Sequence, residues 1–319
     1  EGVVHDLVSR GIAREDAGAK AIFWGEQEGE IPPRLKKQKE PFLIQKSDGA
    51  FLYSTTDIAT VHYRKEKLGA DRALYVVDHR QALHFEQVFT LMKLLGVEIE
   101  LAHIGFGTVL GSDGKPLRTR DATGAALTLR SLLDEAIERA RERIREGIDE
   151  GRIQIAEEEI DELARSVGVG AVKYADLSNH RMTDYQFDLD RMVSFTGNSG
   201  PYLQYVHARS MSIFRRAGIE ESDVSGPITI GTPEEAKLAR RLVRFGDVIA
   251  KVEESYLPHL IAEHLFELAS EFNAFYQACK VIDAENDAVR KSRLALVALT
   301  ARQVRRGLSL LGIEAVSKM

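Results

Sequence analysis

The sequence predicts an α/β part followed by an all-α part. Two patterns carry this prediction: a strand, a helix and a second strand follow one another over residues 73–101, and helical periodicity dominates from residue 127 to the end. Alternating strands and helices indicate a βαβ unit, whereas successive helices indicate a bundle. With 319 residues, 44% of them hydrophobic, the chain is long enough to form two domains with separate cores.

The composition narrows the class of protein. Lys and Arg number 43 against 49 Asp and Glu, so the formal charge of −6 argues against a protein that coats nucleic acid, although a local basic patch would still suit an RNA partner. The only cysteine, Cys279, cannot form an internal disulfide, which suits a reducing cytosol, and its apolar neighbours predict a buried thiol. No apolar run approaches the ~18 residues of a membrane span, so we expect a cytoplasmic protein without membrane contact.

The first forty residues show little pattern. They begin with Glu-Gly-Val-Val-His, without an initiator methionine or the basic start and apolar core of a signal peptide, so we expect the chain to be a fragment. Residues 31–39 are typical of a basic surface loop interrupted by prolines.

Two short strands and a helix are expected next. Residues 42–45 and 50–53 flank Ser-Asp-Gly, in which Gly49 supplies the positive φ that a hairpin turn needs. The hydroxyls of residues 54–56 are expected to cap a helix that Gly69 ends.

The βαβ unit follows. Residues 73–77 form a continuous apolar run, as expected of a strand buried on both faces. Residues 81–95 have helical spacing, and residues 97–101 predict the second strand. Ligands bind beyond the carboxyl ends of such parallel strands, so residues 78–81 and the loop after Leu101 are expected at the rim of a site.

From residue 124 onward the pattern is helical. Residues 127–148 predict a solvated amphipathic helix. The helices expected in the C-terminal bundle are 202–217, 233–256, 260–279 and 287–311. These changes of pattern divide the chain into segments 1–125, 126–199 and 200–319.

Six short strings resemble, in order, those of the bacterial arginyl-tRNA synthetases, a class I family. They are Phe51–Ala59, Tyr75–Gln81 with His84, Phe106–Leu110 continuing through Gly114–Arg120, Gly170–Ser178, Gly200–Arg209 and Leu311–Met319. Each string alone is a weak signal, but together they cover the chain from about residue 42 to its end.

The resemblance implies a fold and an activity. Segment 1–125 would be the C-terminal part of a Rossmann-type catalytic domain, 126–199 a helical connection and 200–319 a helical-bundle anticodon-binding domain. The intact family enzyme activates L-arginine with ATP and Mg²⁺ as substrate, without a tightly bound cofactor, and transfers it to the 2′-hydroxyl of the terminal adenosine of tRNA(Arg). We expect a monomer, inactive on its own because the half that carries the HIGH motif is missing.

By the same resemblance, Tyr53, Asp57 and Gln81 would hold the substrate arginine. Tyr53 and Asp57 are four residues apart at a helix start, so both can project to one side. A carboxylate accepts charge-assisted hydrogen bonds from a guanidinium, whose planar fork lysine cannot match. The alternatives are that Asp57 stabilises a helix dipole and that Tyr53 belongs to the core.

The ATP-binding residues implied by the resemblance are His84, Gly107, Val109 and Lys115. For His84, a histidine packed on the sheet is the other interpretation, and both stay open because an isolated histidine carries little information.

Lys115 and Arg118 match the family form of the KMSKS loop and are the expected catalytic residues. Mobile cations there would meet the charge that grows on pyrophosphate when the arginine carboxylate attacks the α-phosphate. Arg118 stands where the second lysine would be. It keeps the positive charge, but a planar guanidinium replaces the compact ammonium of lysine. A solvated hairpin around Gly111 and Gly114 is the alternative.

Other chemical signatures are missing from the sequence. The nine histidines are scattered without HExxH spacing, and neither a Walker loop nor a GxSxG elbow is present, so we expect no metal site. The string at residues 103–106 looks like HIGH, but it directly precedes the KMSKS-like loop, so we interpret it as a strand end.

The tRNA-binding residues are expected in the helical part. Tyr202, Tyr205 and Tyr276 offer flat faces for unstacked anticodon-loop bases, and Met319 matches a family position that contacts the same loop. Buried bundle tyrosines are the alternative. A local excess of cations suits phosphate contact: Arg290, Lys291, Arg293, Arg302, Arg305, Arg306 and Lys318.

Another class of function stays open: a non-catalytic tRNA-binding paralogue or regulatory module with a decayed site. The presence of Tyr53, Asp57 and Gln81 argues against decay, whereas Arg118 permits it. A nucleotide-binding protein unrelated to tRNA fits the C-terminal strings poorly.

Overall fold

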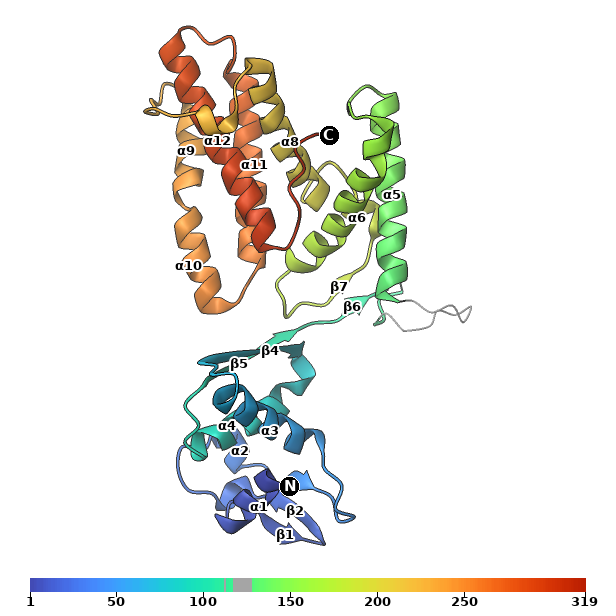
Figure 1. Cartoon of the computed structure of the whole chain (residues 1–319), viewed down its shortest axis with the longest axis vertical. Coiled ribbons are helices and arrows are strands. Elements are labelled where there is room, and N and C mark those ends of the chain that lie inside the picture. The colour runs from blue at the N-terminus through green and yellow to red at the C-terminus, as the bar shows by residue number, and fades with distance from the viewer. Residues whose placement is uncertain (112, 117–127) are drawn as a thin grey trace. The chain divides into compact units, whose positions relative to one another are not determined.

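The computed structural model describes residues 1–111, 113–116 and 128–319. The chain divides into two compact units, Glu1–Gly107 and Thr108–Met319, and each is described by itself (Figure 1).

Unit 1 combines a small antiparallel sheet with a parallel strand pair and helices. Its elements are α1 (Gly2–Ser9), β1 (Arg14–Asp16), β2 (Ala19–Ile22), η1 (Trp24–Glu26), α2 (Pro33–Lys36), β3 (Phe42–Gln45), α3 (Tyr53–Glu66), β4 (Arg72–Asp78), η2 (His79–Gln81), α4 (Ala82–Leu94) and β5 (Glu100–Phe106). β2 pairs antiparallel with both β1 and β3. The strands β1 and β2 were not predicted, because three or four residues leave too little periodicity to recognise.

The predicted βαβ unit is confirmed. β4 and β5 pair in parallel from Arg72 opposite Glu100 to Asp78 opposite Phe106, and α4 connects them. β5 begins three residues later than predicted, because the chain after Gly96 first turns back on the helix. It runs to Phe106, so the HIGH-like string is indeed a strand end.

The expectation that β4 is buried on both faces is wrong. Its burial alternates: Tyr75 packs against Phe85 of α4, with ring centroids 4.8 Å apart, whereas Leu74 and Val76 are 46% and 64% exposed. Among the described residues of unit 1, α4 covers only one face of the strand pair, and an apolar run alone does not reveal this.

The segment before α3 is a turn rather than a full hairpin. Gly49 has the predicted positive φ of 85°, but the expected strand over 50–53 is wrong: a single bridge joins Gln45 to Phe51, and α3 already begins at Tyr53. The Ser54 hydroxyl donates to the Leu43 carbonyl at 2.5 Å, so it ties α3 to β3. The Thr55 hydroxyl accepts from the Leu52 backbone N–H at 3.4 Å, so one of the predicted hydroxyls does cap the helix start.

Unit 2 is mainly helical. Its elements are β6 (Val109–Leu110), α5 (Leu129–Asp149), η3 (Glu157–Glu159), α6 (Ile160–Leu177), β7 (Tyr185–Gln186), α7 (Leu189–Met192), α8 (Gly200–Ala217), η4 (Glu221–Asp223), α9 (Pro233–Val243), α10 (Phe245–Ser255), α11 (His259–Ala278) and α12 (Asp287–Leu310). α5 and α6 lie side by side, and α8, α9, α11 and α12 form the bundle (Figure 1). The helix predicted over 233–256 is two helices, because a turn at Arg244 interrupts it.

Packing holds unit 2 together at two places. The bundle core is made of fully buried side chains such as Phe272, Phe275 and Leu265, and Cys279 is buried as predicted. α6 approaches α5 at Gly168, where a Cβ would lie 2.7 Å from the Ala136 carbonyl oxygen, so this crossing requires glycine.

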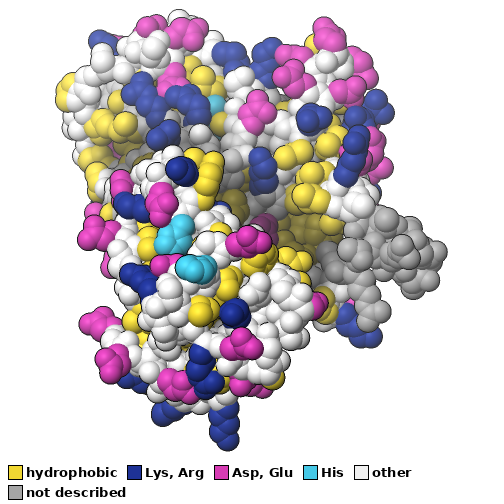
Figure 2. Space-filling view, turned by 60° about the horizontal axis from the view of Figure 1, so that its bottom comes forward, with side chains coloured by type: hydrophobic (Ala, Val, Ile, Leu, Met, Phe, Trp, Pro, Cys, Tyr) yellow, Lys and Arg dark blue, Asp and Glu magenta, His cyan; other side chains and the backbone are white. Residues whose placement is uncertain are grey.

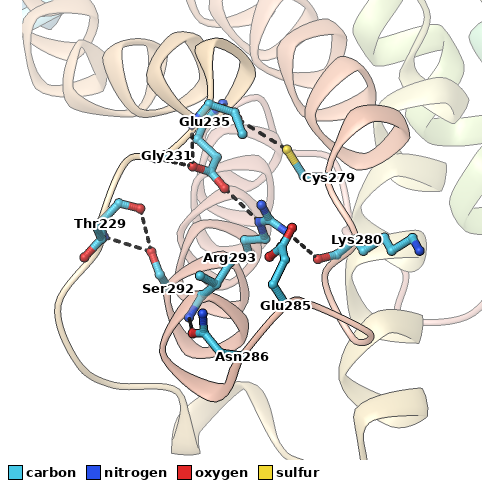
Figure 3. Close-up of polar contacts among 11 residues, drawn as sticks. Thr229, Gly231, Glu235, Cys279, Lys280, Glu285, Asn286, Ser292 and Arg293 are labelled. Atoms are coloured by element: carbon cyan, nitrogen blue, oxygen red, sulfur yellow. Dashed lines mark hydrogen bonds and ion pairs between the residues drawn. The ribbon is translucent and has the colours of Figure 1, made fainter.

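A buried ion pair joins α9 to α12 (Figure 3). Arg293 Nε donates to Glu235 at 2.8 Å, and the two residues are only 5% and 1% exposed. The Glu235 carboxylate also accepts from two loop amides at 2.6 and 3.0 Å, and Arg293 donates to the Lys280 carbonyl at 2.8 Å. Burial would raise the pKa of Glu235, but these hydrogen bonds outweigh it and hold the pKa below its ordinary value. The network fixes the loop before α9 and the loop before α12.

The surface carries both signs of charge. Lys and Arg side chains lie among Asp and Glu side chains on the face drawn in Figure 2. In the part of the chain that the structure describes, no helix is both long and apolar enough to cross a membrane.

Candidate functional site

The predicted arginine-binding residues lie at the starts of two helices of unit 1. Tyr53 is the first residue of α3, Asp57 follows one turn later, and Gln81 directly precedes α4. Tyr53 is 88% exposed, so its interpretation as a core residue is wrong. Asp57 lies beyond the first turn of α3, so the helix-dipole interpretation has no support.

Asp57 is bonded to His84 across the two helices. The distance from His84 Nε2 to Asp57 Oδ2 is 2.7 Å, and the side chains are 27% and 30% exposed. The imidazole also packs against aromatic rings, with centroids 6.0 Å from Phe42 and 5.0 Å from Phe85. His84 therefore packs in unit 1 and, at the same time, holds a predicted substrate-binding carboxylate.

The carboxyl ends of β4 and β5 lie next to each other, so residues 78–81 follow a strand end as predicted. The predicted loop after Leu101 is wrong, because β5 continues to Phe106. The Asp78 carboxylate accepts hydrogen bonds from the Arg80 backbone N–H at 2.8 Å and from the Arg80 guanidinium at 2.6 Å. These bonds hold the pKa of Asp78 well below its usual range. His79 Nδ1 lies 3.1 Å from the Phe106 carbonyl oxygen. A Cβ at Gly105 would lie 3.2 Å from the His79 backbone, so glycine allows this close approach.

The residues predicted to bind ATP fall in both units. Gly107 ends unit 1, whereas Val109 and Lys115 belong to unit 2. Lys115 has an exposed side chain, and its backbone N–H donates to Asp113 at 3.1 Å in a tight turn. Arg118 lies outside the described residues. Their roles stay predictions, as does the solvated-hairpin alternative.

Three of the predicted tRNA-binding residues line one cleft of unit 2. Tyr205 of α8, Tyr276 of α11 and the C-terminal Met319 border a cleft of about 800 Å³. Five cations line the same cleft: Arg152, Arg209, Arg215, Arg216 and Lys318. Glu159 is the only acidic residue among the described lining residues, and it pairs with Lys318 at 3.0 Å. Arg152 pairs with Glu150, so the excess positive charge rests on Arg209, Arg215 and Arg216. The cleft is therefore a local basic site on an acidic chain.

Arg209 links the two tyrosines of the cleft. Its guanidinium carbon lies 5.3 Å from the centroid of the Tyr205 ring and 5.2 Å from that of the Tyr276 ring. Asn273 accepts a hydrogen bond from Arg209 at 3.3 Å, and Arg216 donates to the Tyr276 hydroxyl at 3.5 Å. Cations and aromatic faces at one place suit a nucleic acid, whose phosphates and bases they can meet together.

The C-terminal segment is tied to α8, which places Met319 at the cleft. Gln204 donates to the Glu314 carbonyl at 2.8 Å, and His207 Nδ1 lies 2.8 Å from the Val316 carbonyl oxygen. Burial lowers the pKa of His207, so the neutral ring is favoured as the donor of this bond. The end of the chain is thus held by side chains of a helix that also lines the cleft.

Tyr202 does not line this cleft. Its hydroxyl accepts a hydrogen bond from Asn273 at 2.7 Å, and its ring lies 6.0 Å from that of Phe266. Burial raises the pKa of the Tyr202 hydroxyl. These contacts favour the alternative of a tyrosine packed in the bundle, and a role in tRNA binding stays a prediction.

The cations predicted from the C-terminal stretch include members that are used inside the fold. Arg293 is buried in its ion pair, so its assignment to phosphate contact is wrong. Arg302 and Arg305 both pair with Glu221 at 2.8 Å. Sequence composition counts charges, but it does not reveal which of them have a partner far along the chain.

Sequence reasoning missed Arg209 and Arg216. A signal was present, because Tyr205, Arg209 and Arg216 follow helical spacing and so share one face of α8. Combining the aromatic pattern with the cations of the same helix would have found them.

Comparisons with known proteins bear on both units. Residues 1–189 match the family model described as tRNA synthetases class I (R), catalytic domain, and residues 203–319 match the DALR anticodon binding domain. The arginine--tRNA ligase of Alcanivorax borkumensis is 44% identical over 322 residues, which cover 99% of this chain and 53% of that protein. That of Proteus mirabilis is 46% identical over 323 residues and is covered to 54%. The chain spans about half the length of the curated relatives it matches.

Solved structures agree over the whole chain. The arginyl-tRNA synthetase of Plasmodium falciparum superposes with a TM-score of 0.82 at 31% identity, covering 100% of this chain and 52% of that one. The Thermus thermophilus arginyl-tRNA synthetase gives 0.81 at 26% identity, with 100% and 58% coverage. The predicted fold class, an α/β catalytic part followed by a helical anticodon-binding part, is confirmed.

Proposed function

The chain belongs to the class I arginyl-tRNA synthetase family, and we propose that the complete protein is an arginine--tRNA ligase. In this reaction the arginine carboxylate attacks the α-phosphate of ATP, a new P–O bond forms and pyrophosphate leaves. The 2′-hydroxyl of the terminal adenosine of tRNA(Arg) then attacks the arginyl carbonyl, and AMP leaves. ATP with Mg²⁺ is a substrate of this reaction. We also propose that the complete protein is a monomer and works in the cytoplasm.

For the first step we assign arginine binding to Tyr53, Asp57 and Gln81. The exposed Tyr53 and the partly exposed Asp57 on one side of α3 support this assignment. ATP binding is assigned to Gly107, Val109 and Lys115, and charge stabilisation to Lys115 and Arg118. The resemblance implies an ATP contact for His84 as well, but its bond to Asp57 points to a different role.

For tRNA binding, the observation that carries the proposal is the basic, aromatic cleft. Tyr205, Tyr276 and Met319 were chosen from the sequence as anticodon-loop contacts, and they border one cleft with Arg209 and Arg216. Unstacked bases can stack on the tyrosines while the arginines meet the phosphates. Tyr202, which is partly exposed on α8 three residues before Tyr205, is retained as a proposed contact. The domain boundaries 125/126 and 199/200 are likewise retained as a proposal.

The first test is binding of this chain to in vitro transcribed tRNA(Arg), compared with a lysine tRNA at two salt concentrations. We expect a preference for tRNA(Arg) and weaker binding at high salt, because phosphate contacts release counterions. Tyr276→Ala should weaken binding about 10-fold or more, since a stacked base contributes about 1–3 kcal/mol. Tyr63→Ala is the matched control, because Tyr63 is 57% exposed in unit 1.

Two outcomes would count against the proposal. Equal binding of both tRNAs, or an unchanged affinity in Tyr276→Ala, would remove the cleft as the recognition site. A complete gene product that binds tRNA(Arg) but charges it with no arginine would instead be a non-catalytic tRNA-binding module.

A further inference from the structure

We propose that His84 is a positioning residue for Asp57 and acts at the arginine end of the site rather than on ATP. The inference rests on the proposed function, because it concerns how the substrate guanidinium is held. Its basis is the 2.7 Å bond from His84 Nε2 to Asp57 Oδ2, which joins α4 to α3 across 27 positions of the sequence.

The imidazole is well placed to fix a carboxylate. Its ring packs against Phe42 and Phe85, with centroid distances of 6.0 and 5.0 Å. A surface aspartate otherwise exchanges among rotamers, and ordering it when the ligand arrives costs affinity. Because Asp57 is bonded to a packed ring, its carboxylate is ordered before the ligand binds.

The bond also fixes the tautomer. A carboxylate only accepts hydrogen bonds, so Nε2 carries the hydrogen and His84 binds Asp57 as a donor. Among the described residues, Asp57 Oδ1 has no hydrogen-bond partner, and a carboxylate has lone pairs for further donors. A guanidinium can therefore bind Asp57 while His84 remains in place.

The arrangement predicts which kinetic constant depends on His84. Loss of a residue that orders a ligand-binding group weakens binding of that ligand alone. The KM for arginine should rise while the KM for ATP stays unchanged. A direct contact between His84 and ATP predicts the opposite pattern.

The test is arginine-dependent exchange of pyrophosphate into ATP by the complete gene product, which reports the activation step with both KM values. His84→Ala should raise the KM for arginine about 10-fold, by analogy with the loss of other orienting partners. His84→Gln should recover most of the wild-type KM, because its side-chain N–H lies the same number of bonds from Cα as His84 Nε2. His62→Ala is the matched control, since His62 is 28% exposed on α3 and pairs with Glu66.

The outcomes separate the inference from the proposed function. A raised KM for ATP with an unchanged KM for arginine would overturn the inference and return His84 to the ATP site. Equal losses in His84→Ala and His84→Gln, or losses matched by His62→Ala, would also overturn it. Absence of exchange in the wild-type protein would overturn the proposed function itself, and the inference with it.

Discussion

Two regions of unit 2 use arginine in opposite ways. At the start of α12, Arg293 is 5% exposed and its charge is balanced by Glu235 and Glu285. Along α8, Arg209 lies over tyrosine rings in an open cleft whose described lining holds five cations and one acid. A balanced, buried charge serves folding, whereas an unbalanced charge on aromatic faces is available to a ligand.

The largest expected effect is on folding. Arg293→Met would leave the Glu235 carboxylate buried without its partner, and we expect the free energy of unfolding to fall by about 3–5 kcal/mol. Urea unfolding followed by circular dichroism measures this. The control is Arg302→Met, which breaks a pair with a 44% exposed arginine and should cost less than about 1 kcal/mol. Similar losses in the two variants would contradict the distinction between the regions.

The stability that the Glu235 carboxylate contributes to the wild-type protein depends on pH. The pKa of Glu235 is lower in the folded chain than its ordinary 4.5, so its stabilisation is present above pH 4.5 and is lost as the pH falls below it. The difference in stability between wild type and Arg293→Met should therefore narrow in acid.

The next effect concerns Asp57, where a single carboxylate is expected to bind the substrate cation. Asp57→Asn removes the charge but keeps the shape, and we expect kcat/KM for arginine to fall about 100-fold or more. Pyrophosphate exchange by the complete gene product measures it. A change of less than about threefold would mean that the guanidinium is held elsewhere.

A smaller effect is expected for Arg209 in the cleft. Arg209→Ala should weaken tRNA(Arg) binding about 10-fold and lower the slope of log Kd against log salt by about one, as for one lost phosphate contact. The folded state should lose little stability, in contrast to Arg293→Met. Unchanged salt dependence together with strong destabilisation would show that Arg209 serves the fold.

The smallest effect concerns the attachment of the C-terminal segment. Because burial lowers the pKa of His207 below its ordinary 6.5, the unfolded chain binds more protons, and stability decreases as the pH falls below 6.5. His207→Asn keeps a donor near the Val316 carbonyl but cannot be protonated. We expect the wild-type melting temperature to fall more than that of the variant between pH 7.5 and about pH 5.5. Parallel melting curves would exclude this contribution.

The sequence predicted the parts of the fold that repeat a strong pattern. The strand–helix–strand unit and most of the bundle helices were recognised because apolar residues recur over ten or more positions. β1 and β2 were missed because they have only three and four residues. The exposed face of β4 was missed because an apolar run does not report what covers it.

Only part of the candidate site could be predicted from the sequence. Tyr205 and Tyr276 were predicted from their flat rings and Met319 from a family position, and the fold brings all three to one cleft. The pairing of Asp57 with His84 could not be read from the sequence, because only the packing of α3 and α4 brings residues 27 positions apart together. The burial of Arg293 depends in the same way on Glu235, 58 positions away.

The most direct test of the cleft is cross-linking to tRNA(Arg). A photoreactive phenylalanine analogue replaces Tyr276, and the cross-linked nucleotides are mapped, with the analogue at Tyr63 of unit 1 as the control. We predict cross-links to anticodon-loop nucleotides from position 276. Cross-links to the acceptor stem, or the same cross-links from position 63, would contradict the account.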